Sequence, residues 1–294
     1  MLTFPKKLNN IANNTNAYLK SFFLKQKSNS YLLQPMKYGV FSGGKRFRST
    51  IVVNTGRIFN IDYKKLIIIG SAIECIHSYS LIHDDLPSMD NDELRRGKPS
   101  VHKKFNEFTA ILAGNSLLTL AFEILSGNNF QLSQNYKNEL IKTLSVCAGH
   151  SGLAGGQYSD LTFENKSILK KNIINMQKKK TGELFGFCCE SIAIIKGVNS
   201  TKRKKLKEIG ISIGLLFQIV DDLIDYKGDA AVVGKPTRSD EKKGKATLVN
   251  LLGYKETINF AKNLKKKLGK QIKKYGTKAD DLLESVEFIL KREF

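Results

Sequence analysis

Residues 63–90 decide the fold, and they read YKKLIIIGSAIECIHSYSLIHDDLPSMD. The apolar first part predicts a buried helix over 63–86, which Pro87 ends because proline removes a backbone donor and clashes with the preceding turn. Asp84 falls in the last turn of this helix. Asp90 lies beyond Pro87, so the chain must bend there for its carboxylate to return to Asp84. The stretch therefore predicts a long buried helix that ends in an acidic cluster.

A second acidic cluster, Asp221-Asp222-Leu223-Ile224-Asp225, ends another long segment. We predict a helix that begins with Thr201 as its N-cap and ends near Tyr226. Apolar residues three or four apart form a core stripe, and a second stripe beside it is offset by about 100°. The core stripe is Leu206, Ile209, Ile213, Phe217, Val220 and Ile224, and the second stripe is Gly214, Gln218, Asp221 and Asp225.

Both clusters follow apolar helices, where unpaired carboxylates are costly. Clustered carboxylates repel each other unless a hard cation neutralises them, and Mg²⁺ shares its coordination between carboxylates, water and phosphate oxygens. Arg95 and Arg96 follow the first cluster directly, and guanidinium groups pair well with phosphate. Two such clusters facing one another would make a magnesium clamp, and the arginines indicate a diphosphate substrate.

Further basic groups precede the first cluster. Segment 42–60 opens with a Ser-Gly-Gly turn that feeds a helix, and Lys45 and Arg48 would share one face near its start. His77 lies seven residues before Asp84, nearly two helical turns, and therefore on the same face. A lone histidine is more often a core residue, but this helical phase favours a place in the site.

The rest of the chain also favours helices. We predict them at about 106–126, 136–153, 167–195 and 255–291, the last with a break at Gly276-Thr277. No internal repeat, low-complexity tract or proline-rich linker interrupts the sequence. We therefore predict an all-α protein with a single domain over residues 1–294.

The chain of 294 residues carries 48 Lys and Arg against 27 Asp and Glu, a formal net charge of +21. The lysines are scattered, without aromatic interleaving or zinc-type spacing, so we interpret them as a solvated surface that also steers anionic substrate. The four cysteines form no CxxC pair, and the N-terminal residues lack a signal-peptide core. The longest apolar run, 66–76, is too short for a bilayer. We predict a cytoplasmic protein that neither binds nucleic acid nor inserts stably in a membrane.

Five ordered motifs resemble those of the trans-isoprenyl diphosphate synthases, and most closely the bacterial farnesyl diphosphate synthases. They are SGGKRFR at 42–48, ECIHSYSLIHDD at 74–85, RRGKP at 95–99, KTG at 180–182 and QIVDDLID at 218–225. The four residues between Asp85 and Asp90 match the spacing of the bacterial first motif. The similarity extends over nearly the whole chain from about residue 30.

This resemblance implies an isoprenoid-synthase-type helical bundle around a deep central cavity, in a homodimer. The two aspartate motifs would face each other across the mouth of the cavity. Asp84, Asp90 and Asp221 would hold a cluster of three Mg²⁺ ions, for which Mn²⁺ can substitute, and Asp85, Asp222 and Asp225 would ligate or support it. The allylic diphosphate would contact Arg95, Lys180, Thr181, Gln218, Lys235 and Lys245, and isopentenyl diphosphate would contact Lys45, Arg48, His77 and Arg96.

The implied activity is a condensation of isopentenyl diphosphate with dimethylallyl or geranyl diphosphate, through ionisation, carbon–carbon bond formation and proton loss. Product length should depend on the residues below Asp84, namely Tyr79 and Ser80. In the family an aromatic residue at the position of Tyr79 accompanies C15 products, so we expect (2E,6E)-farnesyl diphosphate. Geranylgeranyl diphosphate is the alternative product.

Three other segments match the sequence pattern of the family less closely. Gly155-Gly156-Gln157 reads as a helix interruption, though it also resembles an element that lines the cavity. Arg238 stands where relatives commonly carry glycine, and Thr247 is not followed by the usual Tyr-Pro. Lys235 and Lys245 nevertheless match the lysines of the family.

Three other classes compete with this interpretation. A terpene cyclase ionises the same kind of substrate, but it typically carries an Asn/Ser/Glu metal motif in place of Asp221-Asp222 and lacks a site such as Lys45 and Arg48. A metal phosphohydrolase would use His83-Asp84, but its further ligands are not evident. A basic nucleic-acid-binding protein is the third class, and it would show steeply salt-dependent retention of DNA or RNA.

Overall fold

The computed structural model describes residues 3–26, 31–227, 240 and 243–292. Within these ranges the regular structure is helical apart from one two-stranded ribbon, which confirms the predicted all-α class. The chain divides into two compact units, Met1–Val53 with Ile61–Ile141 and Asn54–Asn60 with Lys142–Phe294, here called unit 1 and unit 2. Each is described by itself, and the single domain over 1–294 stays a prediction.

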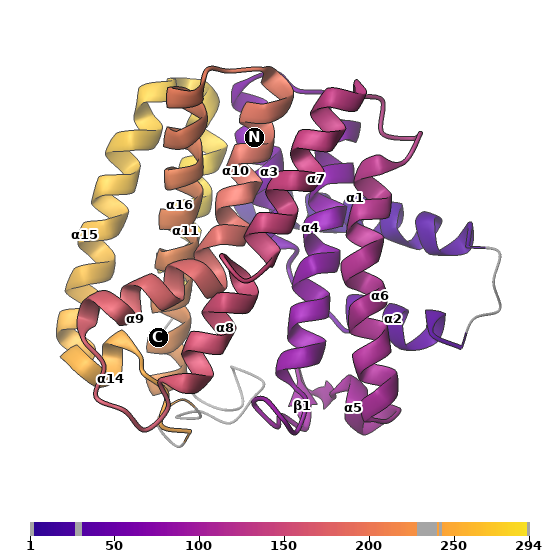
Figure 1. Ribbon diagram of the computed structural model, residues 1–294. Helices are drawn as coiled ribbons and strands as arrows, with labels where there is room; N and C mark the ends of the chain where they lie inside the picture. The colour runs from indigo at the N-terminus through magenta and orange to yellow at the C-terminus, as the bar shows by residue number, and fades with distance from the viewer. Residues whose placement is uncertain (1–2, 27–30, 228–239, 241–242, 293–294) are drawn as a thin grey trace. The chain divides into compact units, whose positions relative to one another are not determined.

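Unit 1 is built around helices α4 and α6, which lie side by side (Figure 1). Its elements are α1 (Phe4–Leu24), α2 (Leu33–Phe41), the first part of α3 (Phe47–Ile58), α4 (Tyr63–Asp84), β1 (Leu94–Arg95), β2 (Lys98–Pro99), α5 (Val101–Lys104), α6 (Glu107–Ser126) and the first part of α7 (Gln134–Ala148). Asp62 caps α4 by accepting a hydrogen bond from the Lys65 backbone N–H at 3.3 Å. Helix α4 ends at Asp84, two residues before the predicted end. It therefore stops before Pro87, as predicted.

Small and polar residues let three helices of unit 1 approach closely. The hydroxyls of Thr15 on α1 and Ser49 on α3 are 2.7 Å apart. A Cβ at Gly70 on α4 would lie 2.1 Å from Oγ of Ser49, so only glycine fits there. Glu74 accepts a hydrogen bond from the Ser49 backbone N–H at 3.2 Å and pairs with Arg46 at 3.7 Å, and both side chains are buried. This pair fastens the start of α3 to α4 and so fixes the neighbours of Arg46.

Unit 2 holds the remaining helices, with α10 and α11 in close contact. They are α8 (Leu153–Thr162), α9 (Lys170–Gln177), the π-helical turn η1 (Lys178–Gly182), α10 (Glu183–Lys196), α11 (Ser200–Lys227), α14 (Leu248–Leu252), α15 (Tyr254–Ile272), the 3₁₀ turns η2 (Lys273–Tyr275) and η3 (Thr277–Ala279), and α16 (Asp280–Leu290). A Cβ at Gly210 on α11 would lie 2.3 Å from the carbonyl oxygen of Phe185, which explains the close contact. The predicted break at Gly276 is confirmed by its φ of +73°.

Four sequence predictions on helices need correction. Thr201 is not the N-cap of α11, because the helix begins at Ser200 and Asn199 accepts the capping bond from the Lys202 backbone N–H at 2.9 Å. Phe217 and Ile224, predicted for the core stripe, are partly exposed. The helix predicted over 136–153 ends at Ala148, and the helix predicted over 167–195 contains the π-helical turn η1.

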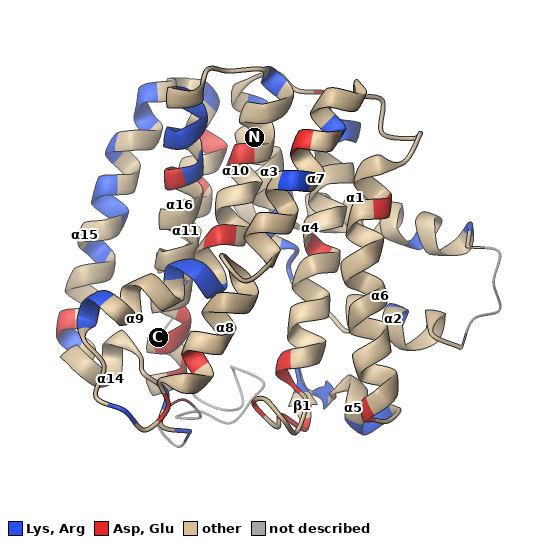
Figure 2. Cartoon of the chain, viewed as in Figure 1, with Lys and Arg blue, Asp and Glu red and all other residues tan. Residues whose placement is uncertain are grey.

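The distribution of charged residues and the burial of the apolar helices agree with what the composition indicates. Lysine and arginine positions occur in both units and recur along α15 (Figure 2). Helices α4 and α6 are long and apolar enough to cross a bilayer, but 78% of the apolar window of α4 is buried inside the structure. All four cysteines are buried, and none forms a disulfide.

Candidate active site

The first aspartate motif folds back on the end of α4. The backbone N–H of Asp90 donates to the carbonyl of Asp84 at 2.9 Å, and that of Asp92 donates to the carbonyl of Asp85 at 3.2 Å. The bend predicted after Pro87 is therefore confirmed. Asp84 and Asp90 are partly exposed, whereas Asp85 is buried. Two carboxylates thus stand at the helix end where a ligand can reach them.

Arg95 ties the following ribbon to this motif. Its Nε donates to Oδ1 of Asp85 at 2.9 Å, and its Nη2 donates to Asp85 and, at 3.2 Å, to Asp92. Burial raises the pKa of Asp85 to about 6, and Arg95 opposes this rise. Asp85 therefore supports the motif from behind.

Arg96 occupies the tight turn of the ribbon, in which Arg95 pairs with Lys98. Arg96 and Gly97 have φ of +53° and +73°, as a type I′ turn requires. The guanidinium donates to the carbonyl of Gly43, and a Cβ at Gly44 would lie 2.6 Å from its Nη1. The predicted turn at residues 42–44 thus contacts the guanidinium of Arg96. Lys45, which follows the turn directly, is exposed.

His77 lies among arginines in unit 1. Burial lowers its pKa well below the usual value, and Arg48, Arg96, Arg46 and Arg95 lower it further. The imidazole is therefore neutral at physiological pH. Of the four residues predicted for isopentenyl diphosphate, the structure brings His77, Arg48 and Arg96 into one electrostatic group.

In unit 2 the buried carboxylate of Asp160 joins two predicted lysines. Its Oδ2 accepts from Lys180 Nζ at 2.7 Å and from Lys245 Nζ at 3.0 Å, and Lys245 also pairs with Glu164 at 2.8 Å. Burial raises the pKa of Asp160, but the two ammonium groups outweigh it, and the net direction is downward. The carboxylate is ionised and fixes both lysines in place.

Two local features bring Lys180 to this position. The π-helical turn η1 carries Lys180 and Thr181, and such turns are frequent at functional sites. A Cβ at Gly156 would lie 2.1 Å from the backbone nitrogen of Lys180. The interpretation of Gly155-Gly156-Gln157 as a helix interruption is wrong, because all three residues lie inside α8, and Gly156 allows that helix to approach η1.

A chain of side-chain hydrogen bonds runs from η1 to the second aspartate motif. Thr181 Oγ1 donates to Gln218 Oε1 at 2.7 Å, and Gln218 Nε2 donates to Asp222 Oδ1 at 2.8 Å. Gln177 Nε2 donates to the other oxygen of Asp222 at 2.7 Å. The structure thus brings Thr181, Gln218 and Asp222 together, and they lie within unit 2.

Replacing Asp222 by asparagine is expected to raise the free energy of unfolding of the ligand-free protein by about 1 kcal/mol. Burial raises the pKa of Asp222 well above 3.8, and Asp240, Asp221 and Asp160 add to this rise. An amide removes the cost of the buried charge, and the buried Oε1 of Gln177, which has no partner among the described residues, can accept the new N–H if that amide turns over. Thermal unfolding followed by circular dichroism at pH 7 in EDTA tests this, and a lower melting temperature would contradict it.

Asp221 and Asp225 differ in their surroundings. Asp225 is buried and accepts from the backbone N–H of Asp240 at 3.1 Å. The side chain of Asp221 is 39% exposed and pairs with Arg292 at 3.0 Å. The guanidinium of Arg292 also lies 4.6 Å from the centre of the Phe217 ring. Asp221 is therefore the accessible carboxylate of the second motif, and an arginine holds it.

The sequence analysis missed Asp160, Gln177 and Arg292. Asp160 could have been found, because it follows Gly156-Gln157 on the same helix as a lone acidic residue. The contacts of Gln177 and Arg292 depend on tertiary packing and leave no local signal. Lys235 and Arg238 lie outside the described residues.

The carboxylates fit a hard cation that takes further ligands from elsewhere. In the ranges 3–26, 31–227, 240 and 243–292, no three His, Cys, Asp or Glu side chains are grouped so that they alone could hold a metal ion. Asp84 and Asp90 supply exposed oxygen donors, as Mg²⁺ prefers, and leave positions for water and phosphate. That the two aspartate motifs face each other stays a prediction.

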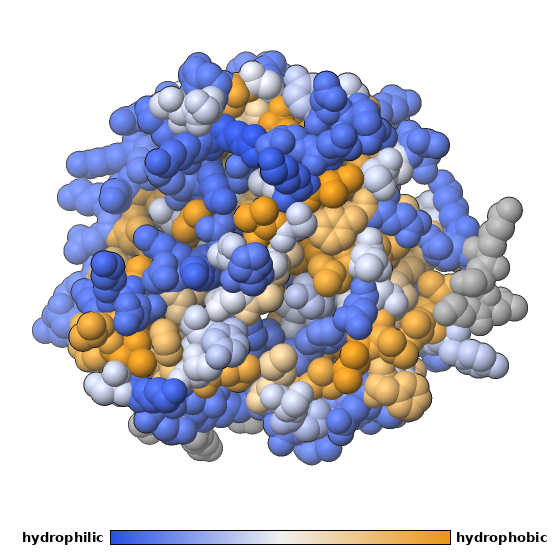
Figure 3. Space-filling view, in the orientation of Figure 1, coloured by the Kyte–Doolittle hydropathy of each residue, from blue (hydrophilic) through white to orange (hydrophobic). Residues whose placement is uncertain are grey.

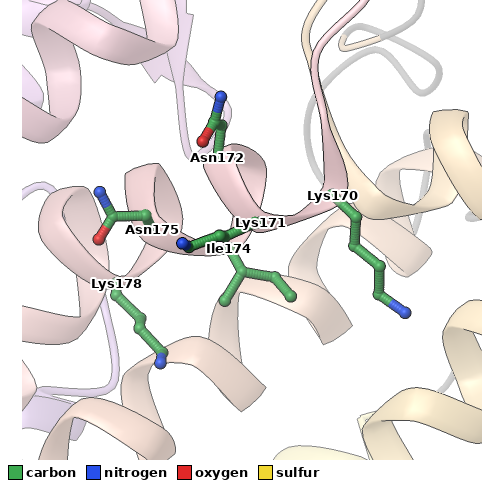
Figure 4. A pocket seen from close by; sticks show the side chains of 6 residues that line it. All are labelled: Lys170, Lys171, Asn172, Ile174, Asn175 and Lys178. Carbon is green, nitrogen blue, oxygen red and sulfur yellow. The ribbon is translucent and has the colours of Figure 1, made fainter.

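A pocket of about 640 Å³ lies elsewhere on unit 2, along α9. Its lining residues are Lys170, Lys171, Asn172, Ile174, Asn175 and Lys178, and their side chains point in different directions rather than toward one centre (Figure 4). None of them is acidic or among the predicted site residues, so we do not assign the site to this pocket.

Known proteins are similar to this chain over most of its length. A family model described as polyprenyl synthetase matches residues 29–286. The farnesyl diphosphate synthase of Escherichia coli (strain K12) is 38% identical over 266 residues, which cover 90% of this chain and 89% of that protein. The farnesyl diphosphate synthase of Geobacillus stearothermophilus is 40% identical over 233 residues, 78% of either chain.

Solved structures of prenyl-diphosphate enzymes are similar to this chain as well. A geranyltransferase from Helicobacter pylori, complexed with magnesium and isoprenyl diphosphate, has a TM-score of 0.85 at 33% identity and matches 99% of this chain and 97% of its own. An FPP/GFPP synthase from Zymomonas mobilis has a TM-score of 0.85 at 39% identity, over 97% of this chain and 98% of its own. The matched family model covers all five motifs found in the sequence, and the chain therefore belongs to the polyprenyl synthetase family.

Proposed function

We propose that this chain is a magnesium-dependent prenyltransferase that condenses isopentenyl diphosphate with dimethylallyl and geranyl diphosphates to give (2E,6E)-farnesyl diphosphate and diphosphate. The relatives named above support the reaction class and the product. The observation that carries the proposal is the return of the Asp90 backbone to Asp84 at 2.9 Å. It sets two accessible carboxylates beside the Arg95-Arg96 ribbon, as an enzyme acting on diphosphates requires.

Asp84, Asp90 and Asp221 would hold a cluster of three Mg²⁺ ions, with Mn²⁺ able to replace them. When bound, the cations neutralise the charge that develops on the leaving diphosphate. Asp85, Asp222 and Asp225 are buried and would orient their neighbours. The hydrogen bonds from Arg95 and the two glutamines described above support that role.

The first chemical step breaks the carbon–oxygen bond of the allylic diphosphate, and the electron pair leaves with the diphosphate. Arg95, Lys180 and Lys245 provide positive charge for this leaving group, together with Lys235. Asp160 already fixes two of the lysines, so little reorganisation is needed as charge develops. Thr181 holds Gln218 in one orientation beside them.

In the second step the double bond of isopentenyl diphosphate gives its electron pair to the allylic carbon, and a new carbon–carbon bond forms. A neighbouring C–H proton then passes to the departing diphosphate. Lys45, Arg48, Arg96 and neutral His77 would bind the second diphosphate and orient the double bond. No protein nucleophile takes part.

The test is to incubate purified protein with Mg²⁺, isopentenyl diphosphate and each allylic primer in turn, and to measure product length by mass spectrometry. Farnesyl diphosphate is the expected main product. Geranylgeranyl diphosphate as the main product would favour the alternative. Absence of prenyl products, with salt-dependent retention of DNA or RNA, would favour a nucleic-acid-binding protein.

Replacing Arg292 by glutamine is expected to lower the Mg²⁺ concentration for half-maximal activity by about two- to fivefold, the range of a partly exposed ion pair. A cation at Asp221 has to displace the guanidinium, which lies 3.0 Å from Oδ1. Titration of activity with Mg²⁺ measures this, and Arg203→Gln, which removes an ion pair to Glu190 elsewhere in unit 2, is the control. An unchanged or higher Mg²⁺ requirement in the Arg292 variant would show that the arginine does not compete with the cation.

We also propose a homodimer in which α6 contributes to the interface. Phe108, Ile111 and Leu112 are 66%, 43% and 46% exposed on this helix, and hydrophobic side chains gather over this part of unit 1 in Figure 3. Clustered exposed apolar side chains mark interaction surfaces. Light scattering should give twice the chain mass, and Phe108→Glu with Leu112→Glu should give the monomer. A monomeric wild type would remove this part of the proposal.

We propose a cytoplasmic location, which the four buried cysteines without a disulfide support. The small-molecule partners are prenyl diphosphates. Cell fractionation checks the location, and recovery in the membrane pellet after a high-salt wash would contradict it.

A further inference from the structure

The imidazole of His83 is fitted between Tyr79 and helix α6. The rings of Tyr79 and His83 lie one helical turn apart on α4, with centroids 5.3 Å apart and planes at 89°. On its other side, Nε2 of His83 lies 3.0 Å from the carbonyl oxygen of Ile111. A carbonyl can only accept, so Nε2 carries the proton in this contact. The ring is thus held from two sides within unit 1.

Gly114 supplies the space that the His83 ring occupies. A Cβ at Gly114 would lie 2.2 Å from Nε2 and 2.4 Å from Cδ2 of His83, far inside contact distance. The glycine has no positive φ that would require it. Its absent side chain is therefore explained by the close approach of the imidazole.

Tyr79 precedes the first aspartate motif on α4. It is half-buried and lies five residues before Asp84 on α4. Its pKa is raised by burial and then by the charge of Asp84, which shows that the phenol lies within electrostatic range of the motif. Ser80, the other predicted length-determining residue, uses its hydroxyl to donate to the His77 carbonyl at 2.9 Å.

We propose that His83, seated in the notch of Gly114, sets product length by holding the Tyr79 ring in one orientation. This inference rests on the proposed function. His83 is a positioning residue, because it acts on the growing chain only through Tyr79. Edge-to-face contact favours one setting of the phenol ring over others by about two- to tenfold in population. Without it, the ring can turn aside and a longer tail can pass.

The experiment compares product lengths for His83→Gln, Gly114→Ala and the wild type. Glutamine keeps an N–H for the Ile111 carbonyl and removes the ring, so α6 keeps its anchor. Alanine at position 114 pushes the imidazole out of its notch. Both variants are expected to raise the ratio of C20 to C15 product by about two- to tenfold. Gly269→Ala is the control, since a Cβ there meets no atom within 4 Å.

A second comparison separates positioning from a general loss of structure. In a Tyr79→Ala background, His83→Gln is expected to leave the C20 to C15 ratio unchanged, because the residue through which it acts is gone. A further rise there as large as in the wild-type background would overturn the inference.

The readouts keep two failures apart. A C15-only profile in both His83→Gln and Gly114→Ala, at measurable turnover, would overturn the inference and leave the proposed function standing. Absence of any prenyl product from the wild type would overturn the proposed function, and this inference with it. C20 product forms by elongation of C15 product, so the ratios are compared at equal consumption of isopentenyl diphosphate, and partial loss of folded Gly114→Ala protein then does not hide the result.

Discussion

Replacing Asp84 by asparagine is expected to lower kcat/KM for the condensation by about a thousandfold. The carboxylate stands at the end of α4 and shares its loop with Asp90, whose backbone is bonded to that of Asp84. An amide keeps the shape of the side chain but loses the charge that a hard cation requires. Turnover of geranyl and isopentenyl diphosphates under saturating Mg²⁺ measures the loss.

The fold of this variant should be unaffected. Asp84 is partly exposed, and substitutions at such positions change the free energy of unfolding by about 0.5 kcal/mol or less. Glu123→Gln on the exposed side of α6 is the matched control, because it makes the same chemical change elsewhere in unit 1. Activity within about tenfold of wild type in the Asp84 variant would refute the assignment of Asp84 as an essential ligand.

The first motif could be predicted from sequence because its structure is decided locally. Pro87 ends α4 through its own backbone chemistry, whatever the helix packs against. The chain then has only a few residues in which to return Asp90 to Asp84. The Arg96-Gly97 turn and the glycines before Lys45 are likewise set by backbone preferences. The structure at such positions can be predicted without knowledge of the tertiary fold.

Other features could not be predicted because they depend on partners distant in the sequence. The sequence KKKTG of η1 does not by itself indicate a π-helical turn, and the close approach of Gly156 to its backbone comes from a different helix. Arg292 reaches Asp221 across 71 positions of sequence. Asn199 caps α11 in place of Thr201, since asparagine is the stronger N-cap and starts the helix two residues earlier.

The role of Asp160 is the clearest example, because the sequence shows it only as a single acid. Replacing Asp160 by asparagine is expected to lower the free energy of unfolding by about 2–3 kcal/mol, since it leaves two ammonium groups beside each other. The carboxylate is buried and lies 2.7 Å from Lys180 and 3.0 Å from Lys245. Glu164→Gln is the matched control: it removes a more exposed carboxylate from Lys245 alone and should cost less than half as much.

The pH dependence follows from the direction of the pKa shift. The pKa of Asp160 in the folded protein lies below 3.8, so its contribution is complete above the unfolded value and disappears as pH falls through the folded value. The difference in melting temperature between wild type and the Asp160→Asn variant should be constant from about pH 5 to 8 and shrink below about pH 4.

Diphosphate should compensate for the missing carboxylate. If Lys180 and Lys245 bind the leaving group, added inorganic diphosphate gives both lysines a new anionic partner, and it should raise the melting temperature of the Asp160→Asn variant more than that of wild type. Differential scanning calorimetry with and without diphosphate measures both effects. If the variant and the wild type had the same melting temperature, Asp160 would not stabilise the lysines. If diphosphate raised the melting temperature of both proteins equally, the leaving group would not bind at these lysines.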